Sequence, residues 1–218
     1  MKRSSASALT LAVLVQLAAG CAMNKAEKGA IIGAGAGGAV GAAVGNATGS
    51  TVRGAIIGAA VGGVAGAVIG HQMDKQAQEL AYELPGATVQ RVGEGIAVTF
   101  PEGLLFGFDS DQLMPAARDH LRTFAASLAK YPNTRTLIVG HTDSEGSAAY
   151  NMDLSDRRAS SAATFIAAEG VDRARISTAG RGEAEPIATN STDAGRQQNR
   201  RVEIAIYVKD ATGSGSGN

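Results

Sequence analysis

The stretch 136–158 constrains the fold more than any other, because a strand pattern runs directly into a helix pattern there. Apolar and β-branched residues at 136–139 lead into Gly140, and Asp143 stands just beyond the strand end. The helical pattern that follows repeats polar residues at i, i+4 and i+7, so their side chains share one face. These residues are Asn151, Ser155 and Arg158. The pattern therefore predicts that an acid at a strand end looks toward a basic helix stripe.

Asp143 and Arg158 would suit a ligand that carries both an ammonium and a carboxylate, because each ligand charge would find its opposite in a fixed place. Each residue also has a purely structural interpretation. Aspartate after a strand often forms a turn, and an arginine stem can pack while its charged head stays in water. His141, beside Gly140, is interpreted as a packed or loop-orienting residue rather than a general base, because a base also needs a nucleophile within reach.

The rest of the C-terminal half alternates strand and helix patterns. Pro85-Gly86 breaks a polar helical segment and sets the predicted domain boundary. Helix 115–130 is expected to turn Leu121, Phe124, Ala125 and Leu128 inward. The order of elements predicts an α+β fold, a β-α-β-α-β sandwich of helices on one mixed sheet. The predicted elements are a hairpin of strands 88–91 and 96–100, helix 115–130, a strand ending at Gly140, helix 149–168, strand 175–179, helix 194–199 and strand 201–208.

The N-terminus has the three-part pattern of a secretory signal. Lys2 and Arg3 precede an uncharged apolar run, 8–19, which ends in small residues before Cys21, the only cysteine. The run is shorter than the ~20 residues of a membrane span. The site resembles a bacterial lipobox, which implies that residues 1–20 are a removed signal peptide and that Cys21 carries the lipid, palmitate included. The alternative is an ordinary signal peptide with an incidental cysteine.

A repeat of 25 residues follows the cysteine. The segment 28–34 recurs at 53–59, and in both copies every fourth residue is glycine. Ten glycines disfavour an isolated helix, since each costs about 1 kcal/mol relative to alanine. A glycine ridge instead lets a second backbone approach closely. We therefore expect a glycine-zipper helical hairpin that turns within the polar stretch 46–51.

Two interpretations of this hairpin stay open. Each copy is about 25 Å long as a helix, slightly short of the ~30 Å hydrocarbon core, and neither copy contains an internal charge. The hairpin could insert in or lie against the membrane and form homo-oligomers. It could equally be a compact glycine-rich spacer in the periplasm.

Several function classes have little support in the sequence. Acidic and basic residues both number 20, and no basic stripe with interleaved aromatics occurs, so nucleic acid is not expected as a partner. The three histidines lack zinc-ligand spacing, and no nucleophile elbow is present. We therefore expect no enzyme activity, no cofactor and no metal.

A longer string of residues is similar to a known family. It begins with Thr142-Asp143, Asn151, Leu154-Ser155 and Arg158-Ala159, and continues with Gly180-Arg181-Gly182-Glu183, Pro186, Asn190, Gly195-Arg196 and Asn199-Arg200-Arg201-Val202-Glu203. This ordered string resembles the OmpA C-terminal domain family, the peptidoglycan-binding module of outer-membrane proteins and lipoproteins. The resemblance covers roughly 95–208, since Phe106 to Asp109 resembles the segment that opens the family domain.

The resemblance implies a role for each matched residue. Asp143 would hold the diaminopimelate ammonium of the peptidoglycan stem peptide, and Arg158 would receive its carboxylate. Asn151 would help to bind the stem peptide. Supporting positions are implied for Thr142, Asp109 and Arg201.

Together these features predict an outer-membrane lipoprotein that binds the cell wall non-covalently and tethers the membrane to it. Ala22 favours the outer membrane, because aspartate after the lipidated cysteine would resemble an inner-membrane retention signal. The alternative is a membrane-embedded or pore-like zipper oligomer that the wall-binding domain only positions. The predicted domains are 1–20, signal; 21–84, lipid-anchored glycine-zipper region; 85–210, wall-binding domain in the periplasm; and 211–218, disordered tail.

Overall fold

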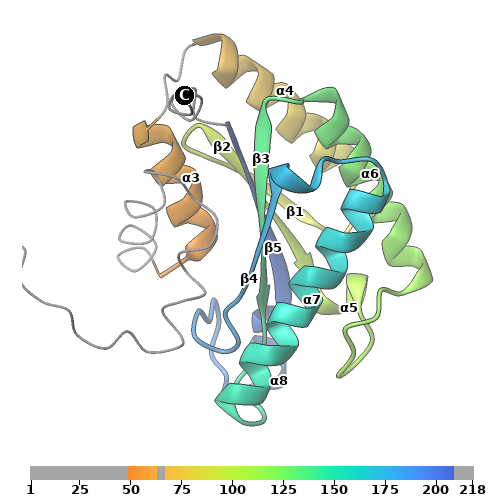
Figure 1. Ribbon diagram of the computed structural model, residues 1–218. Coiled ribbons are helices and arrows are strands. Elements are labelled where there is room, and N and C mark those ends of the chain that lie inside the picture. The colour runs from red at the N-terminus through yellow and green to blue at the C-terminus, as the bar shows by residue number, and fades with distance from the viewer. Residues whose placement is uncertain (1–48, 63–66, 209–218) are drawn as a thin grey trace, which may run out of the picture.

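A five-stranded mixed sheet forms the centre of the molecule (Figure 1). The computed structural model describes residues 49–62 and 67–208. The strand order is β1-β2-β5-β3-β4, in which only β3 and β4 are parallel neighbours. The strands are β1 (Thr88–Val92), β2 (Gly95–Pro101), β3 (Thr134–His141), β4 (Ile176–Gly180) and β5 (Arg201–Val208).

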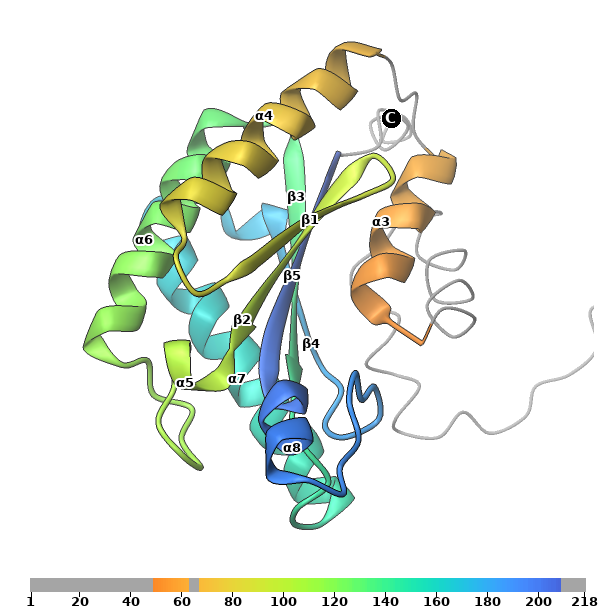
Figure 2. The same cartoon turned by 180° about the vertical axis from the view of Figure 1, so that it is seen from behind.

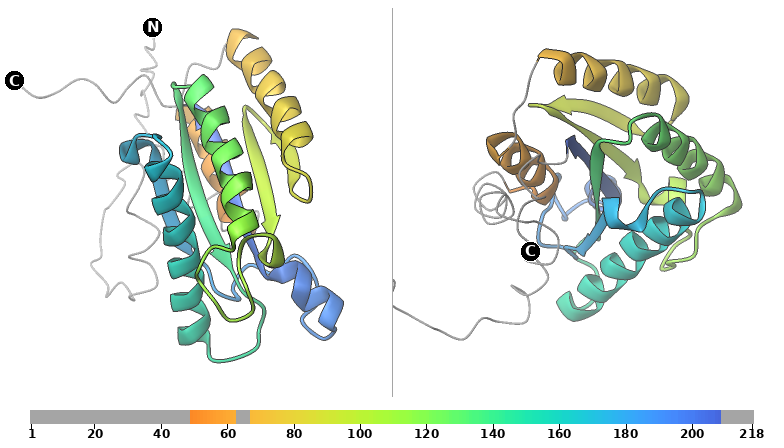
Figure 3. Two further views of the ribbon diagram at one scale, coloured as in Figure 1. Left: turned by 90° about the vertical axis from the view of Figure 1, so that its right-hand side faces the viewer. Right: turned by 45° about the horizontal axis from the view of Figure 1, so that its top comes forward.

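Helices lie on both faces of this sheet (Figures 2 and 3). Three helices cover one face: α4 (Ala67–Glu83), α6 (Pro115–Lys130) and α7 (Ala148–Ala168). Of the helices in residues 49–62 and 67–208, α3 (Thr51–Gly62) is the one that lies on the other face, alongside β5. Shorter elements at the ends are α5 (Glu102–Leu105), the 3₁₀ turn η1 (Arg173–Arg175) and α8 (Asp193–Asn199).

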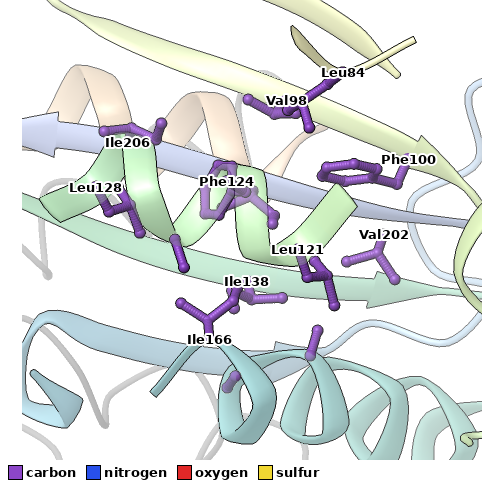
Figure 4. Packing of buried hydrophobic residues seen from close by; sticks show 14 of the residues in the cluster. Leu84, Val98, Phe100, Leu121, Phe124, Leu128, Ile138, Ile166, Val202 and Ile206 are labelled. Atoms are coloured by element: carbon purple, nitrogen blue, oxygen red, sulfur yellow. The ribbon is translucent and has the colours of Figure 1, made fainter. Parts of the chain in front are cut away.

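The main core fills the space between the sheet and the three-helix face (Figure 4). Phe100 of β2 meets Phe124 of α6 edge to face, with ring centroids 6.4 Å apart. Such a pair contributes about 0.5–1.5 kcal/mol beyond the apolar area it buries. All four residues expected to point inward from α6, Phe124 among them, are buried. The 3.6-residue period of that helix is therefore confirmed.

The predicted strands and helices of the C-terminal half are confirmed to within two residues at each end. Period-2 and 3.6-residue patterns were sufficient because each element has one face in the core. Two short elements, α5 and η1, were missed. Neither is long enough to repeat a hydrophobic pattern.

Helix α4 precedes the predicted boundary at Pro85 and yet belongs to the main core. Leu80 and Leu84 have no exposed surface, and Met73 is also buried. Arg91 of β1 binds the Asp74 carboxylate at 2.7 Å. The packed unit therefore begins N-terminal to residue 85.

Helix α3 contains part of the second glycine-zipper copy and packs on the opposite face of the sheet. Val52 and Ile56 form a second buried cluster with Val139 and Ala205. The approach is close at Gly95 of β2, where an added Cβ would lie 2.6 Å from the Ile56 side chain. This part of the second copy therefore contacts the sheet directly.

The first turn of α3 is attached by polar contacts. The Thr51 backbone N–H donates to the Glu185 carboxylate at 3.0 Å, and Arg181 donates to the Thr51 hydroxyl at 2.7 Å. Arg181 and Glu185 also pair with each other at 3.2 Å. A carboxylate at a helix N-terminus is favourable because it meets free N–H groups and the positive end of the helix dipole.

Several predictions lie outside the described residues: the signal peptide 1–20, lipidation of Cys21, the first glycine-zipper copy and the tail 211–218. Among the helices of residues 49–62 and 67–208, none has the length and apolar character that a bilayer crossing needs.

Candidate functional site

Asp143 lies in the loop that leaves β3. The Thr142 N–H donates to the Gly182 carbonyl at 2.9 Å, and the Thr142 hydroxyl donates to the Asp143 carbonyl at 2.9 Å. The Asp143 carboxylate accepts the Glu145 N–H at 3.0 Å, which is a turn of the kind aspartate commonly forms. The structural interpretation of Asp143 therefore applies, and it leaves the second carboxylate oxygen, Oδ2, for another partner.

Helix α7 carries the predicted polar stripe. Ser147 caps its first turn through the Tyr150 N–H. Asn151, Ser155 and Arg158 are all buried on one face, as predicted. The Ser155 hydroxyl donates to its own helix at the Met152 carbonyl, 2.8 Å away, and accepts the Gly182 N–H at 2.9 Å. Ser155 therefore joins α7 to the loop after β4.

Asn151 connects three segments of the site. Its amide donates to the Asp143 carbonyl at 3.2 Å and to the Glu183 carboxylate at 2.7 Å. The amide thus fixes the loop after β3 against the loop after β4. Asn151 is buried, so a ligand would meet a preformed arrangement here rather than a flexible one.

Arg158 is 2% exposed, so the interpretation of this residue as a solvated surface charge is wrong. Its guanidinium lies over the Phe106 ring, 5.6 Å from the centroid. It donates to the Ser110 carbonyl at 2.9 Å and forms an ion pair with Glu102. These three contacts fix the orientation of the Arg158 guanidinium.

Asp143 and Arg158 do not pair with each other but are joined through two further charged residues. Arg200 donates to Asp143 Oδ2 at 2.5 Å and to Glu102 at 2.7 Å, and Glu102 pairs with Arg158. The result is an alternating chain of four charges. Burial lowers the pKa of Arg200, but the hydrogen bond to Asp143 and the charge of Glu102 outweigh this effect and raise the pKa above its usual value.

Glu102 and Arg200 are the members of this network that sequence reasoning missed as site residues. Glu102 lies in the four-residue helix α5, and its N–H donates to the Arg200 carbonyl at 3.0 Å. No periodicity could have indicated Glu102. Arg200 is next to the predicted Arg201 in the sequence, and the structure shows that the Arg200 side chain, not that of Arg201, reaches Asp143.

Arg201 takes part in a separate set of contacts. It pairs with Glu203 at 2.7 Å and donates to the carbonyls of Asn199 and Glu185 at 3.1 Å. Glu203 and Ala205 follow at alternate positions of β5, and Ala205 contacts the cluster under α3. The structure therefore places the Arg201 side chain on the α3 face, away from α7.

Asp109 is exposed and has φ of 53°, a left-handed conformation that is uncommon outside glycine. Its carboxylate accepts the Tyr150 hydroxyl, which ties this loop to the first turn of α7. Phe108, next to it, is almost wholly exposed. Asp109 therefore lies at the rim of the site, outside the buried network.

His141 is buried, and neither ring nitrogen has a hydrogen-bond partner in the described part of the chain. Burial, reinforced by the charges of Arg201 and Arg181, lowers its pKa well below 6.5. The imidazole is therefore neutral at pH 7.

The fold and the matched motif place the C-terminal half in a known family of domains. Residues 105–200 match the model of the OmpA family, and residues 1–74 match that of the YMGG-like Gly-zipper. The chain therefore carries an OmpA-family domain and a glycine-zipper region, as the sequence predicted.

Curated relatives agree with this assignment. The probable lipoprotein YiaD of Escherichia coli is 44% identical over 56% of this chain and 55% of its own length. Outer membrane protein A of Bordetella avium is 43% identical over 50% of this chain and 56% of its own length. Peptidoglycan-binding protein ArfA of Mycobacterium tuberculosis is 42% identical over 47% of this chain and 32% of its own length. The chain spans about half the length of the first two relatives.

A solved structure, the cell wall anchor of the T6SS from Pseudomonas aeruginosa, is also similar. It has 30% sequence identity and a TM-score of 0.56, over 62% of this chain and 97% of that structure. The fold of this chain is thus similar to that of a cell wall anchor over the matched part. The names of these four relatives thus describe a probable lipoprotein, an outer membrane protein, a peptidoglycan-binding protein and a cell wall anchor.

Proposed function

We propose that this protein binds the diaminopimelate-containing stem peptide of peptidoglycan non-covalently. The observation that carries the proposal is the placement of Asp143 and Arg158, both buried, in one charge network at one end of the sheet. The names of the wall-binding relatives support the same class of ligand. An amino acid centre with one ammonium and one carboxylate offers a charge opposite to that of Asp143 and a charge opposite to that of Arg158.

In this proposal Asp143 accepts the diaminopimelate ammonium, and Arg158 donates to the carboxylate. Arginine suits the second task because its planar guanidinium can offer two parallel N–H donors to a carboxylate. Asn151 and Thr142 hold the Asp143 loop in place. Asp109, with Tyr150, borders the rim where the rest of the peptide would lie.

The N-terminal region supplies the second half of the proposal, a tether to the outer membrane. Lipidation of Cys21 would anchor residue 21, since each buried methylene adds about 0.8 kcal/mol and two or more chains give stable attachment. The packing of α3 on the sheet favours this arrangement over a pore-like assembly of both zipper copies. Ala55 and Ile56 of the second copy already pack against the sheet.

Co-sedimentation with isolated diaminopimelate-type cell wall tests the first half. The full chain, purified in detergent, should pellet with the wall, and Asp143→Asn should remain in the supernatant. Asp156→Asn is a matched control, because Asp156 lies exposed on α7. Equal pelleting of the Asp143 and Asp156 variants would refute the proposed site.

Membrane fractionation of Cys21→Ser tests the second half. The unlipidated protein should leave the membrane after a salt wash. Full retention would instead show that the glycine-zipper region is the main anchor and would revive the alternative of a membrane-embedded assembly.

A further inference from the structure

We propose that the Glu102–Arg200 pair is an internal stand-in for the ligand. In the unliganded protein Glu102 occupies the carboxylate position on Arg158, and Arg200 occupies the ammonium position on Asp143. Ligand binding then exchanges an internal ion pair for an external one. This inference rests on the proposed function and identifies the residues that set its affinity and selectivity.

The chemistry of the network supports this assignment. The two residues proposed to bind the ligand are already neutralised, each by a group of the sign that the ligand would bring. Glu102 offers a carboxylate, as diaminopimelate would, and Arg200 offers a cation. A ligand with both charges therefore cannot bind without displacing or sharing both internal partners.

Exposure indicates which side chains can leave. The side chains of Arg158 and Asp143 are 2% and 7% exposed, whereas those of Glu102 and Arg200 are 11% and 26% exposed. The stand-in residues are thus the outer members of the network. They can rotate toward water while the inner pair remains in place.

The backbone would not have to move. The Glu102 N–H donates to the Arg200 carbonyl, and the Phe106 N–H donates to the Glu102 carbonyl at 2.8 Å. These bonds keep the two stand-in residues adjacent. Glu102 and Arg200 already pair at 2.7 Å, so they can stay paired after release, which lowers the cost of exchange.

Selectivity follows from the same geometry. A diaminopimelate carboxylate competes with Glu102 for Arg158, whereas a lysine-type stem peptide has no such carboxylate. Removing the Glu102 charge should therefore strengthen binding of the diaminopimelate peptide only. Removing the Arg200 charge should strengthen binding of both peptides, because both carry an ammonium.

The test uses calorimetric titration of the full chain in detergent with stem peptides that contain either diaminopimelate or lysine. Glu102→Gln keeps the size and an acceptor oxygen but removes the charge. It should bind the diaminopimelate peptide about three- to tenfold more tightly, since hydrogen bonds to charged groups are stronger than neutral ones. It should bind the lysine peptide no more tightly than wild type does.

Arg200→Gln is the second variant and should bind both peptides more tightly than wild type. The matched control is Glu169→Gln, which removes a glutamate that pairs with Arg122 at 3.3 Å and lies at the C-terminal end of α7, about three helical turns from Arg158. This control should leave both affinities unchanged. Thermal melts of all three variants verify that each is folded.

Weaker or unchanged diaminopimelate binding by Glu102→Gln would overturn the inference, because Glu102 would then be a residue that positions Arg158. An equal gain for both peptides would also overturn it. Wild-type protein that binds neither peptide would refute the proposed function itself. The two failures are therefore distinguishable.

Discussion

Gly140 of β3 lies directly beneath the backbone of Ser155, so that a Cβ added at Gly140 would stand 2.0 Å from the Ser155 carbonyl oxygen. Gly180 of β4 faces the same helix, with an added Cβ 2.8 Å from the Met152 carbonyl oxygen. These two glycines let α7 approach the sheet closely. The depth of α7 in turn sets where Asn151 meets the loop of Asp143 and where Arg158 meets Glu102.

Replacing Gly140 by alanine should therefore destabilise the fold and weaken wall binding together. Overpacking typically costs about 1–3 kcal/mol, and here the obstacle is backbone, which cannot rotate away. Urea unfolding measures the loss. Gly103→Ala is the control, because nothing lies within 4 Å of its added Cβ. A Gly140→Ala protein as stable as the Gly103→Ala protein would contradict the close approach.

Arg158→Met should weaken binding of a diaminopimelate stem peptide by about ten- to a hundredfold, since a hydrogen bond to a charged group contributes roughly 1.5–3 kcal/mol. Methionine keeps an apolar stem against Phe106 but removes the charge. Binding of a lysine-type peptide should change by less than about twofold. Calorimetry on both peptides measures this, with Arg157→Met, an exposed neighbour on α7, as control. Equal losses for the two peptides would mean that Arg158 does not read the carboxylate.

The buried His141 should make the protein less stable in mild acid. Its pKa in the folded state is lowered well below 6.5, so the unfolded chain takes up a proton first as the pH falls. Stability is therefore complete above pH 6.5 and declines below it, toward the lowered pKa, by up to about 1.4 kcal/mol per pH unit.

Urea unfolding between pH 7.5 and 5 measures this decline. His141→Gln should show a smaller decline than wild type over the same range. The exposed His71, replaced in the same way, serves as the control. Parallel pH profiles for His141→Gln and wild type would rule out a contribution from this imidazole.

Leu80→Ala in α4 should cost about 2–5 kcal/mol of unfolding free energy, the usual range for a fully buried leucine. Tyr82→Ala, two residues away and almost wholly exposed, should change stability by no more than about 0.5 kcal/mol. For the same reason a fragment that starts at Gly86 should be less stable than one that starts at Ser50. Equal stability of the two fragments would show that α4 is dispensable.

The comparison of α7 with α4 shows what sequence patterns can and cannot predict. The polar face of α7 was correctly predicted because residues at i, i+4 and i+7 share one face wherever the helix lies. In α4 the apolar residues Met73, Ala77 and Leu80 recur at similar spacing and pack in the core, together with Leu84 just beyond the helix end. The Pro85-Gly86 pair marks the end of a helix, but it does not separate that helix from the core that follows.

The charge network could be predicted only in part. The matched motif identified Asp143, Arg158 and Asn151, all of which the structure brings together. Their partners depend on which side chains of distant segments meet. Glu102 and Arg200 are separated by 98 residues, and their pairing requires the β2–β5 register that places Pro101 opposite Arg201. No local pattern contains that information.

The attachment of α3 has a mechanical consequence for the proposed tether. Thr51, at the start of α3, is held by Arg181 and Glu185. The loop that carries these two residues also contains Gly182, whose carbonyl accepts the N–H of Thr142, next to Asp143. Tension between a lipid at residue 21 and a wall ligand at the site would thus enter and leave at the same end of the molecule. The five strands would lie outside this load path, and the stretch from residue 21 to 50 could extend no further than about 100 Å.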